Sequence, residues 1–367
     1  MDQRAPKLRR GWTTGACATA ALKAALTRLW GGAAPERVRI TLPRGERVEF
    51  AVAFCEAGQE QAGQGQAGHG WAEAGIIKDA GDDPDVTHGA MIRARVAPGG
   101  QGLRFVAGEG VGIVTRPGLP VAVGEAAINP VPRAMMGEVV QALAAMYGQA
   151  PDLEITLSIP GGAALAEKTW NPRLGIRGGL SILGTTGIVR PFSCAAWIAS
   201  IHRGVDVARA SGLKHVAGTT GATSEAAVQA LYGLPDHAML DMGDFVGGLV
   251  KYLRRNPVER LTIGGGIAKL TKLAQGAVDL HSARSQVDFA ALAAWLEDEE
   301  VAHMNTVLQA YEKHGKNLVD IVAQKALVRL QLLLRGAPVA VDVVVVERSG
   351  KVVGWAGGRD MAQDMAR

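Results

Sequence analysis

The first half of the chain combines two hydrophobic patterns. Apolar side chains recur at helical spacing in residues 14–29 and 132–147. The alternation of apolar and polar residues that is typical of strands occurs in residues 38–42, 48–54, 90–96, 103–107 and 153–159. These elements follow no regular strand–helix rhythm, so we predict an α+β domain.

The second half has a regular rhythm of strand, polar turn and helix. Strand-like segments at 215–217, 238–240 and 261–263 each lead into a glycine-containing loop and then a helix. Three consecutive units of this kind predict a parallel sheet with right-handed crossovers. After a helical region, a hairpin of 339–347 and 351–355 is expected to close the sheet. We therefore predict an α/β Rossmann-like domain with a mainly parallel sheet.

The change of rhythm gives the predicted domain boundary. A glycine-rich run ends at Pro191, and a helix is expected to begin near Ser193. The predicted domains are residues 1–192, with loops that contact the substrate, and residues 193–367, which bind the cofactor. Residues 57–70 consist mainly of Gly, Gln and Ala, and this composition predicts a flexible surface insertion without chemistry.

Composition narrows the class of protein. With 48% hydrophobic and 20% charged residues, the chain can build real cores, and its 48 glycines favour a small-molecule enzyme. No apolar stretch is long enough to cross a membrane. The net charge is only +4 and the basic residues are dispersed, so we do not expect nucleic acid as a partner, and an anionic small substrate is compatible with this charge. Three cysteines without metal-ligand spacing predict no metal site and a cytoplasmic setting.

The loops after the second-half strands suggest a nucleoside site. A glycine turn before a helix offers free N–H groups, but Glu225 in the first helical turn would repel a phosphate, and phosphate-binding fingerprints are missing. Asp241 follows Gly221 by 20 residues, about where dinucleotide folds place the acid that binds ribose. S-adenosylmethionine, a nucleoside without phosphate, fits these features, and a structural Asp that caps a helix is the alternative. The predicted cofactor residues are Gly218, Thr219, Thr220, Gly221, Glu225, Asp241, Asp244, Gly264 and Gly265.

Four aspartates lie within seven positions of the segment 78–89. Crowded carboxylates raise one another's pKa and could supply a metal site or a general base, although the spacing does not match an EF-hand. The alternative is a turn capped by its own side chains. We predict that Asp82 or Asp83 is the catalytic carboxylate, with His88 and His281 as rival bases.

Residues 168–190 place four cations around two glycine clusters. Arginine beside flexible backbone is suited to binding carboxylates or phosphates, and a solvated linker between domains is the alternative. The cations are Lys168, Arg173, Arg177 and Arg190.

Distinctive motifs occur along nearly the whole chain: Gly11-Trp12-Thr13-Thr14-Gly15 with Cys17, 78–89, 108–112, 128–133, 180–187, 242–247 and Lys269-Leu270. In these motifs the sequence resembles the CbiD family, the cobalt-precorrin-5B (C1)-methyltransferases of cobamide biosynthesis. The resemblance implies methyl transfer from S-adenosylmethionine to ring carbon C1 of cobalt-precorrin-5B, which gives cobalt-precorrin-6A. Cobalt then enters with the substrate. The family usually has Gly-His-x-Gly-Lys-Leu where residues 265–270 of this chain read Gly-Gly-Ile-Ala-Lys-Leu. Any role of that His in the family is therefore in doubt for this chain.

The resemblance also implies a corrinoid substrate that carries many carboxylates, for which arginines are natural partners. The predicted substrate residues are Thr13, Thr14, Lys78, Arg133, Arg173, Arg177, Thr185, Thr186 and Arg190. Two other functions stay open, a Rossmann-type nucleotide-dependent enzyme and a non-catalytic corrinoid carrier. The sequence leaves open whether copies assemble into a homo-oligomer.

Overall fold

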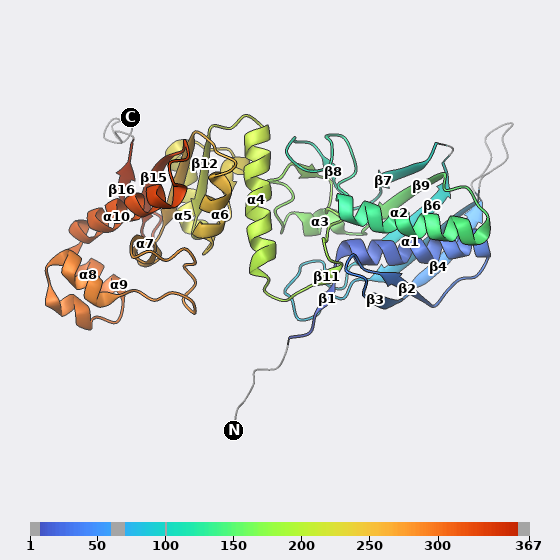
Figure 1. Ribbon diagram of the computed structural model, residues 1–367, viewed down its shortest axis with the longest axis horizontal. Helices are drawn as coiled ribbons and strands as arrows, with labels where there is room; N and C mark the ends of the chain where they lie inside the picture. The colour runs from blue at the N-terminus through green and yellow to red at the C-terminus, as the bar shows by residue number, and fades with distance from the viewer. Residues whose placement is uncertain (1–7, 60–69, 100, 359–367) are drawn as a thin grey trace, which may run out of the picture. The chain divides into compact units, whose positions relative to one another are not determined.

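The computed structural model describes residues 8–59, 70–99 and 101–358 (Figure 1). The chain divides into two compact units, residues 1–193 (unit 1) and 194–367 (unit 2). This division lies one residue from the boundary expected from the sequence. The roles expected for the two halves remain predictions.

Unit 1 is built on a five-stranded sheet in the order β4–β5–β6–β9–β7. Neighbouring strands are antiparallel except for β7 and β9, which are parallel. The strands are β4 (Phe54–Gln59), β5 (Gly70–Ile77), β6 (Met91–Pro98), β7 (Leu103–Ala107) and β9 (Leu153–Ser158). Alternate residues of β6 and β9 are buried, which gives the sheet one core face, as the sequence pattern predicts. The hydrophobic pattern did not predict β5, which lies between β4 and β6.

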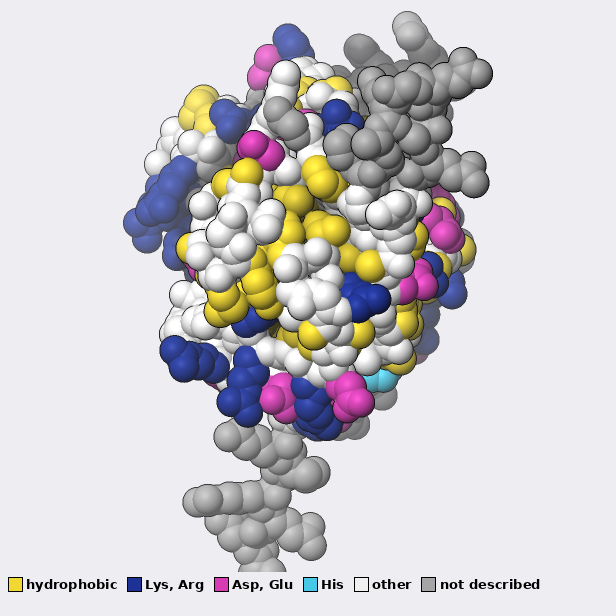
Figure 2. All heavy atoms as spheres, turned by 90° about the vertical axis from the view of Figure 1, so that its right-hand side faces the viewer, with side chains coloured by type: hydrophobic (Ala, Val, Ile, Leu, Met, Phe, Trp, Pro, Cys, Tyr) yellow, Lys and Arg dark blue, Asp and Glu magenta, His cyan; other side chains and the backbone are white. Residues whose placement is uncertain are grey.

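Two helices, α1 (Thr14–Gly31) and α2 (Pro130–Tyr147), pack over that core face (Figure 1). They run side by side in one direction, since Gly15 lies against Pro132 and Gly31 lies against the Tyr147 ring. The Ala-rich α1 is buried from Thr14 to Leu22, because small side chains allow its neighbours to approach closely. Hydrophobic side chains also gather in the middle of one face of unit 1 (Figure 2).

Short elements complete unit 1. The hairpin predicted near 38–54 is confirmed and consists of β2 (Arg37–Thr41) and β3 (Arg47–Ala51). Two small ladders join distant segments, and one short helix follows the central sheet. These elements are β1 (Gly11–Trp12) with β11 (Ile188–Val189), β8 (Ile113–Val114) with β10 (Ile176–Arg177), and α3 (Gly162–Ala166).

Unit 2 contains a mainly parallel sheet in the order β13–β12–β14–β15–β16, as the sequence rhythm predicts. Only β16 is antiparallel to its neighbour. The strands are β12 (His215–Thr219), β13 (Met239–Leu240), β14 (Arg260–Gly265), β15 (Ala340–Val346) and β16 (Val352–Gly357). The helices are α4 (Cys194–Ala210), α5 (Ala222–Tyr232), α6 (Val246–Leu253), α7 (Ile267–Ala274), α8 (Phe289–Leu296), α9 (Val307–His314) and α10 (Lys316–Leu334), with 3₁₀ turns at Asp236–Ala238 and Glu299–His303.

Helices cover both faces of this sheet. Along β15, Val343 and Val345 join the apolar cluster that includes α4, α6, α7 and α10. Val344 and Val346 join the smaller cluster with Val228 of α5. Burial on both faces explains why β15 is a continuous valine run instead of an alternating pattern.

The prediction of a flexible insertion at residues 57–70 is wrong at both of its ends. Ala57, Gly58 and Gln59 belong to β4 and pair with the first residues of β5. A Cβ atom on Gly58 would lie 2.8 Å from the Trp71 ring, so packing against this indole requires glycine here. Residues 60–69 lie outside the described part of the chain.

Candidate functional site

The carboxyl ends of the parallel strands in unit 2 bring three polar loops together. The amide of Thr220, after β12, donates a hydrogen bond to the carbonyl of Gly264 at the end of β14 (3.0 Å). The amide of Gly243, after β13, donates to the carbonyl of Thr219 (3.0 Å). The predicted cofactor segments are therefore neighbours in space.

Lys269 on α7 links these loops through its side chain. Its Nζ donates to the carbonyl oxygen of Thr220 (3.1 Å) and lies 3.0 Å from Oδ1 of Asp244. Reasoning from the sequence assigned no role to this lysine. Its position in the sequence could have indicated such a role. Lys269 lies in the first turn of the helix that follows Gly264-Gly265-Gly266, and this turn is at the carboxyl end of the strands, where the loops converge.

Three of the predicted cofactor glycines are explained by packing. A Cβ atom on Gly218 would lie 2.5 Å from the Leu249 side chain, and one on Gly264 would lie 2.5 Å from Val228. A Cβ atom on Gly265 would lie 2.7 Å from Oγ1 of Thr220. Gly221, by contrast, faces open space. Of the glycines predicted to bind the cofactor, Gly221 is therefore the one where a ligand can approach the backbone directly.

The acidic residues of this region differ in their surroundings. Asp244 Oδ1 is buried and accepts no hydrogen bond from any residue that the structure describes, although Lys269 is close. The carbonyl of Asp241 accepts a hydrogen bond from the Trp197 indole (2.8 Å). Glu225 lies in the first turn of α5, as expected. Oδ1 of Asp244 is thus committed to the ion pair with Lys269, and a hydroxyl group would bind the other carboxylate oxygen.

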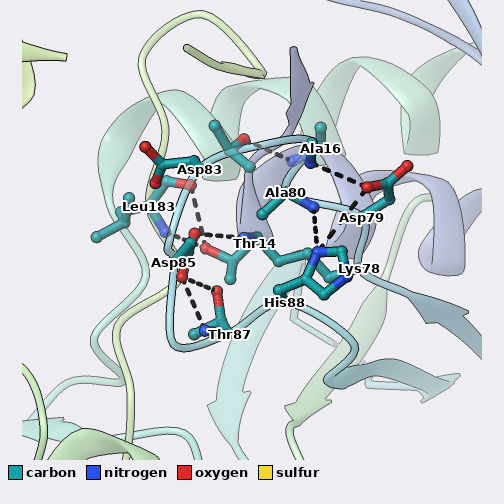
Figure 3. Close-up of polar contacts among 12 residues, drawn as sticks. Thr14, Ala16, Lys78, Asp79, Ala80, Asp83, Asp85, Thr87, His88 and Leu183 are labelled. Atoms are coloured by element: carbon teal, nitrogen blue, oxygen red, sulfur yellow. Dashed lines mark hydrogen bonds and ion pairs between the residues drawn. The ribbon is translucent and has the colours of Figure 1, made fainter. Parts of the chain in front are cut away.

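In unit 1, the loop after β5 encloses a buried ion pair (Figure 3). The Lys78 side chain is 1% exposed, and its Nζ contacts Asp85 at 2.5 Å. Asp85 also accepts hydrogen bonds from the amide and hydroxyl of Thr87 (2.8 and 2.6 Å). Burial acts to raise the pKa of Asp85, but the Lys78 charge and these hydrogen bonds together lower it. Lys78 is therefore a structural cation, and its predicted contact with substrate is not supported.

The other aspartates of this loop also hold neighbouring segments. Asp79 binds the Arg9 guanidinium, and this hydrogen bond lowers the pKa of Asp79. Asp82 accepts a hydrogen bond from the Arg9 amide (2.6 Å), and Asp83 accepts one from the Phe192 amide (2.9 Å). The expected upward pKa shift from crowding does not occur at Asp79 or Asp85, where the shift is downward. The catalytic role of Asp82 or Asp83 remains a prediction.

The two rival bases share one unfavourable feature. Nδ1 of His88 accepts a hydrogen bond from the amide of Ala80 (3.1 Å; Figure 3), and Nδ1 of His281 accepts one from Ala283 (3.2 Å). A neutral imidazole that accepts at Nδ1 carries its proton on Nε2. Each exposed Nε2 is then a donor, so this geometry disfavours both histidines as general bases.

The predicted substrate threonines mostly have structural partners. Thr13 caps α1 by accepting a hydrogen bond from Ala16, and Thr14 exchanges hydrogen bonds with the backbone of Leu183 (Figure 3). Both side chains are buried. The Thr186 hydroxyl bonds the backbone of Ile188, whereas Thr185 is exposed.

Of the four predicted substrate arginines, Arg173 lies over the Trp170 ring, and the other three fall into two groups. Arg133 donates to the carbonyls of Ile128 and Ala126 (2.8 and 3.1 Å) and pairs with Glu125 (2.8 Å), so it stabilises the start of α2. Arg177 and Arg190 are exposed, and neither side chain forms an ion pair or hydrogen bond with the described residues. The exposed pair is therefore the better candidate for binding an anion.

Metal and thiol chemistry have little support in the described residues. No three His, Cys, Asp or Glu side chains in them are grouped closely enough to hold a metal ion. Cys17, in the first motif of the chain, is fully buried, and this burial raises the pKa of its thiol to about 12. None of the helices in the described ranges is long and apolar enough to span a membrane.

Comparisons with known proteins extend over nearly the whole chain. The family models described as CbiD and as CbiD, C-terminal domain match residues 1–191 and 279–357. Curated relatives include the cobalt-precorrin-5B C(1)-methyltransferase of Brucella anthropi, 57% identical over 96% of both chains, and that of Brucella canis, 58% identical over 95% of both. A solved structure of a cobalamin biosynthesis protein (CbiD) from Archaeoglobus fulgidus is 25% identical, with a TM-score of 0.39 over 84% of this chain and 85% of that one.

We predict that Asp85→Asn lowers the free energy of unfolding by about 3 kcal/mol at neutral pH, because it leaves the Lys78 charge buried and unpaired. Since folding lowers the pKa of Asp85, the loss should be full at neutral pH and shrink as the pH falls below about 4. Urea unfolding at several pH values measures both effects.

Asp82→Asn is the matched control in the same loop, and it should cost less because Asp82 neutralises no buried cation. Adding Lys78→Met to Asp85→Asn should restore part of the lost stability. Equal losses for Asp82→Asn and Asp85→Asn would contradict the role given to the ion pair.

Proposed function

The chain belongs to the CbiD family, and from that premise we propose that it catalyses S-adenosylmethionine-dependent methylation of ring carbon C1 of cobalt-precorrin-5B, giving cobalt-precorrin-6A. The observation that carries the proposal is the 57% identity, over 96% of both chains, to the cobalt-precorrin-5B C(1)-methyltransferase of Brucella anthropi. The proposed setting is the cytoplasm, with an anionic cobalt corrinoid as the small-molecule substrate.

We place the methyl donor at the carboxyl ends of the unit 2 strands, in a Rossmann-like arrangement. After β12 the chain turns to β13 on one side, and after β14 it continues to β15 on the other. Ligands of open α/β sheets bind outside the strand ends at such a switch point. Gly221, which faces open space, lies at this point, and the Asp244 carboxylate lies on the loop that follows β13.

The residues of this region suit a cationic nucleoside. The Asp244 carboxylate can accept a ribose hydroxyl beside its ion pair with Lys269, and the acidic residues Glu225 and Asp241 suit a ligand with a sulfonium or ammonium group. When bound, S-adenosylmethionine supplies an electrophilic methyl group. Lys269 holds the Thr220 carbonyl and Asp244 in place, which fixes the loops on which such a ligand would rest.

The chain's contribution to methyl transfer is then mainly alignment. A carbon nucleophile of the ring must approach the methyl group opposite the sulfur, and fixing this geometry removes much of the entropic barrier. We propose that the carboxylate of Asp82 or Asp83 removes a ring proton or stabilises positive charge on the substrate. Thr185, Arg177 and Arg190 remain the proposed substrate contacts of unit 1 that are exposed.

The function itself is tested with labelled S-adenosylmethionine and the cobalt-bearing, ring-contracted substrate. We expect the label in a product with one added methyl group on C1, and calorimetric binding of S-adenosylhomocysteine. Binding of a nicotinamide or adenine nucleotide in place of S-adenosylhomocysteine would favour a nucleotide-dependent enzyme. Binding of corrinoid alone would favour a carrier.

We predict that Asp241→Ala or Asp244→Ala weakens S-adenosylhomocysteine binding by about 1–3 kcal/mol, the cost of losing charged hydrogen bonds. Lys269→Met should also weaken binding, because Asp244 and Thr220 lose their common partner. Isothermal calorimetry measures the affinities.

Lys214→Met and Asp236→Ala serve as controls for these variants, since both residues precede β12 or β13 and lie toward the amino ends of the strands, away from the carboxyl ends where the donor is placed. Their affinities should match the parent. Parental affinity in both Asp241→Ala and Asp244→Ala would overturn this placement of the donor site.

We predict that Asp82→Asn or Asp83→Asn slows single-turnover methyl transfer by roughly 10² or more with bound substrates, the usual scale for a proton-transfer group. His88→Ala and His281→Ala should have smaller effects, because the exposed nitrogen of each ring is a donor. Rapid-quench measurements with saturating ligands separate the chemical step from binding. If both Asp variants transfer methyl at the parental rate and a His variant transfers it slowly, the catalytic role belongs to the histidine and not to Asp82 or Asp83.

A further inference from the structure

Two segments of unit 1 contain arginines and no acidic residue, 110–124 and 168–190. The small β8–β10 ladder joins them, with Ile113 opposite Arg177 and Val114 opposite Ile176. We call residues 113–116 and 170–177 the arginine ribbon, after Arg116, Arg173 and Arg177. The ladder brings together guanidinium groups that are about 60 residues apart in sequence.

Arg116 is fixed in the ribbon without a carboxylate. Its side-chain stem lies over Gly175, where a Cβ atom would come within 2.6 Å of the Arg116 Cβ and Cγ. One guanidinium nitrogen donates to the carbonyl of Arg173 (3.2 Å). Thr115 holds the carbonyl of Gly175 through both its amide and its hydroxyl (2.7 and 2.6 Å). The remaining N–H groups of Arg116 have no hydrogen bond or ion pair within the described part of the chain.

The other two arginines are positioned by their neighbours. The guanidinium carbon of Arg173 lies 5.3 Å from the centre of the Trp170 ring, a cation–π distance. Residues directly opposite in an antiparallel ladder point to the same face. Since Val114 and Ile176 are the buried pair, Arg177 projects from the outer face beside Ile113.

Several arginines of unit 1 outside the ribbon are neutralised by carboxylates. On the β2–β3 hairpin, Arg37 and Arg39 both pair with Glu49. Arg104 on β7 pairs with Glu154. The acid next to the ribbon in sequence, Glu125, is taken up by Arg133. Within the part of the chain that the structure describes, Arg116 and Arg177 therefore carry positive charge that no carboxylate neutralises.

We propose that the arginine ribbon binds carboxylates on the rim of the corrinoid substrate, an inference that rests on the proposed function. A guanidinium presents its N–H groups in a planar fork that matches a carboxylate. The Arg116 guanidinium, which already donates to a backbone carbonyl, loses little conformational entropy on binding. A macrocycle with several peripheral carboxylates can engage more than one guanidinium group at once, and Arg116 joins Arg177 in recognition.

The test compares two probes, a cobalt corrinoid with free peripheral carboxylates and the same corrinoid with these groups as methyl esters. Absorbance titration at constant ionic strength gives the affinities. For the free acid we expect Arg177→Gln and Arg116→Gln each to weaken binding about tenfold, as expected for loss of a charge-assisted hydrogen bond. The methyl ester should bind weakly to the parent and to the variants alike.

Arg44→Gln is the matched control, because Arg44 is an exposed arginine in the β2–β3 turn with no described side-chain partner and gives the same change in net charge. It should bind the free acid like the parent. Arg177 is exposed, so its variant should keep the parental melting temperature, which separates binding from folding even if Arg116→Gln unfolds. Parental affinity in Arg177→Gln, or equal weakening in Arg44→Gln, would overturn the proposal.

Tight binding of the ester by the parent would also overturn it, because carboxylates would then be unnecessary. Failure of the proposed function would give a different set of results from failure of the carboxylate-binding proposal. The labelled methyl group would not be transferred, while the difference between acid and ester and its dependence on Arg177 would persist.

Discussion

A buried ammonium group is the constraint on which much of unit 1 depends. With 1% of its side chain exposed, Lys78 must keep a carboxylate within hydrogen-bond reach, because a buried unpaired charge costs several kcal/mol. Asp85 meets this need, and the chain between the two residues has to close into a tight loop. The same loop then binds the N-terminal segment, since the Trp12 amide donates to the carbonyl of Asp79 and Arg9 binds the Asp79 carboxylate.

Unit 2 also uses a lysine to organise loops, but this lysine lies where a ligand can reach it. The Lys269 side chain is 38% exposed and joins the loops that follow β12 and β13. A buried pair such as Lys78–Asp85 has a single stable arrangement, whereas a half-exposed cation can adjust its contacts when a ligand arrives. This difference in solvent access agrees with a structural role for the first pair and a positioning role for Lys269.

Most of the ionisable side chains that the sequence singled out have structural partners, and this bears on the proposed chemistry. Arg133 stabilises a helix start, Lys78 neutralises Asp85, and the ring nitrogens of His88 and His281 accept backbone hydrogen bonds. Methyl transfer to carbon depends on alignment of the reacting atoms more than on acid–base groups. The family's activity is therefore compatible with structural partners for most of these side chains.

The sequence by itself determined the strand–turn–helix rhythm of unit 2, the hairpin near residues 38–54, and the family, because periodicity and motifs are local properties of the chain. Only the tertiary structure decided what each polar group contacts. That Lys78 is buried and Gly218 and Gly264 are needed for packing follows from residues distant in sequence. The role of Gly58 in β4 likewise depends on Trp71 across the ladder. Charge pairing and close packing are set by three-dimensional neighbours, and hydrophobic periodicity along the chain carries no information about them.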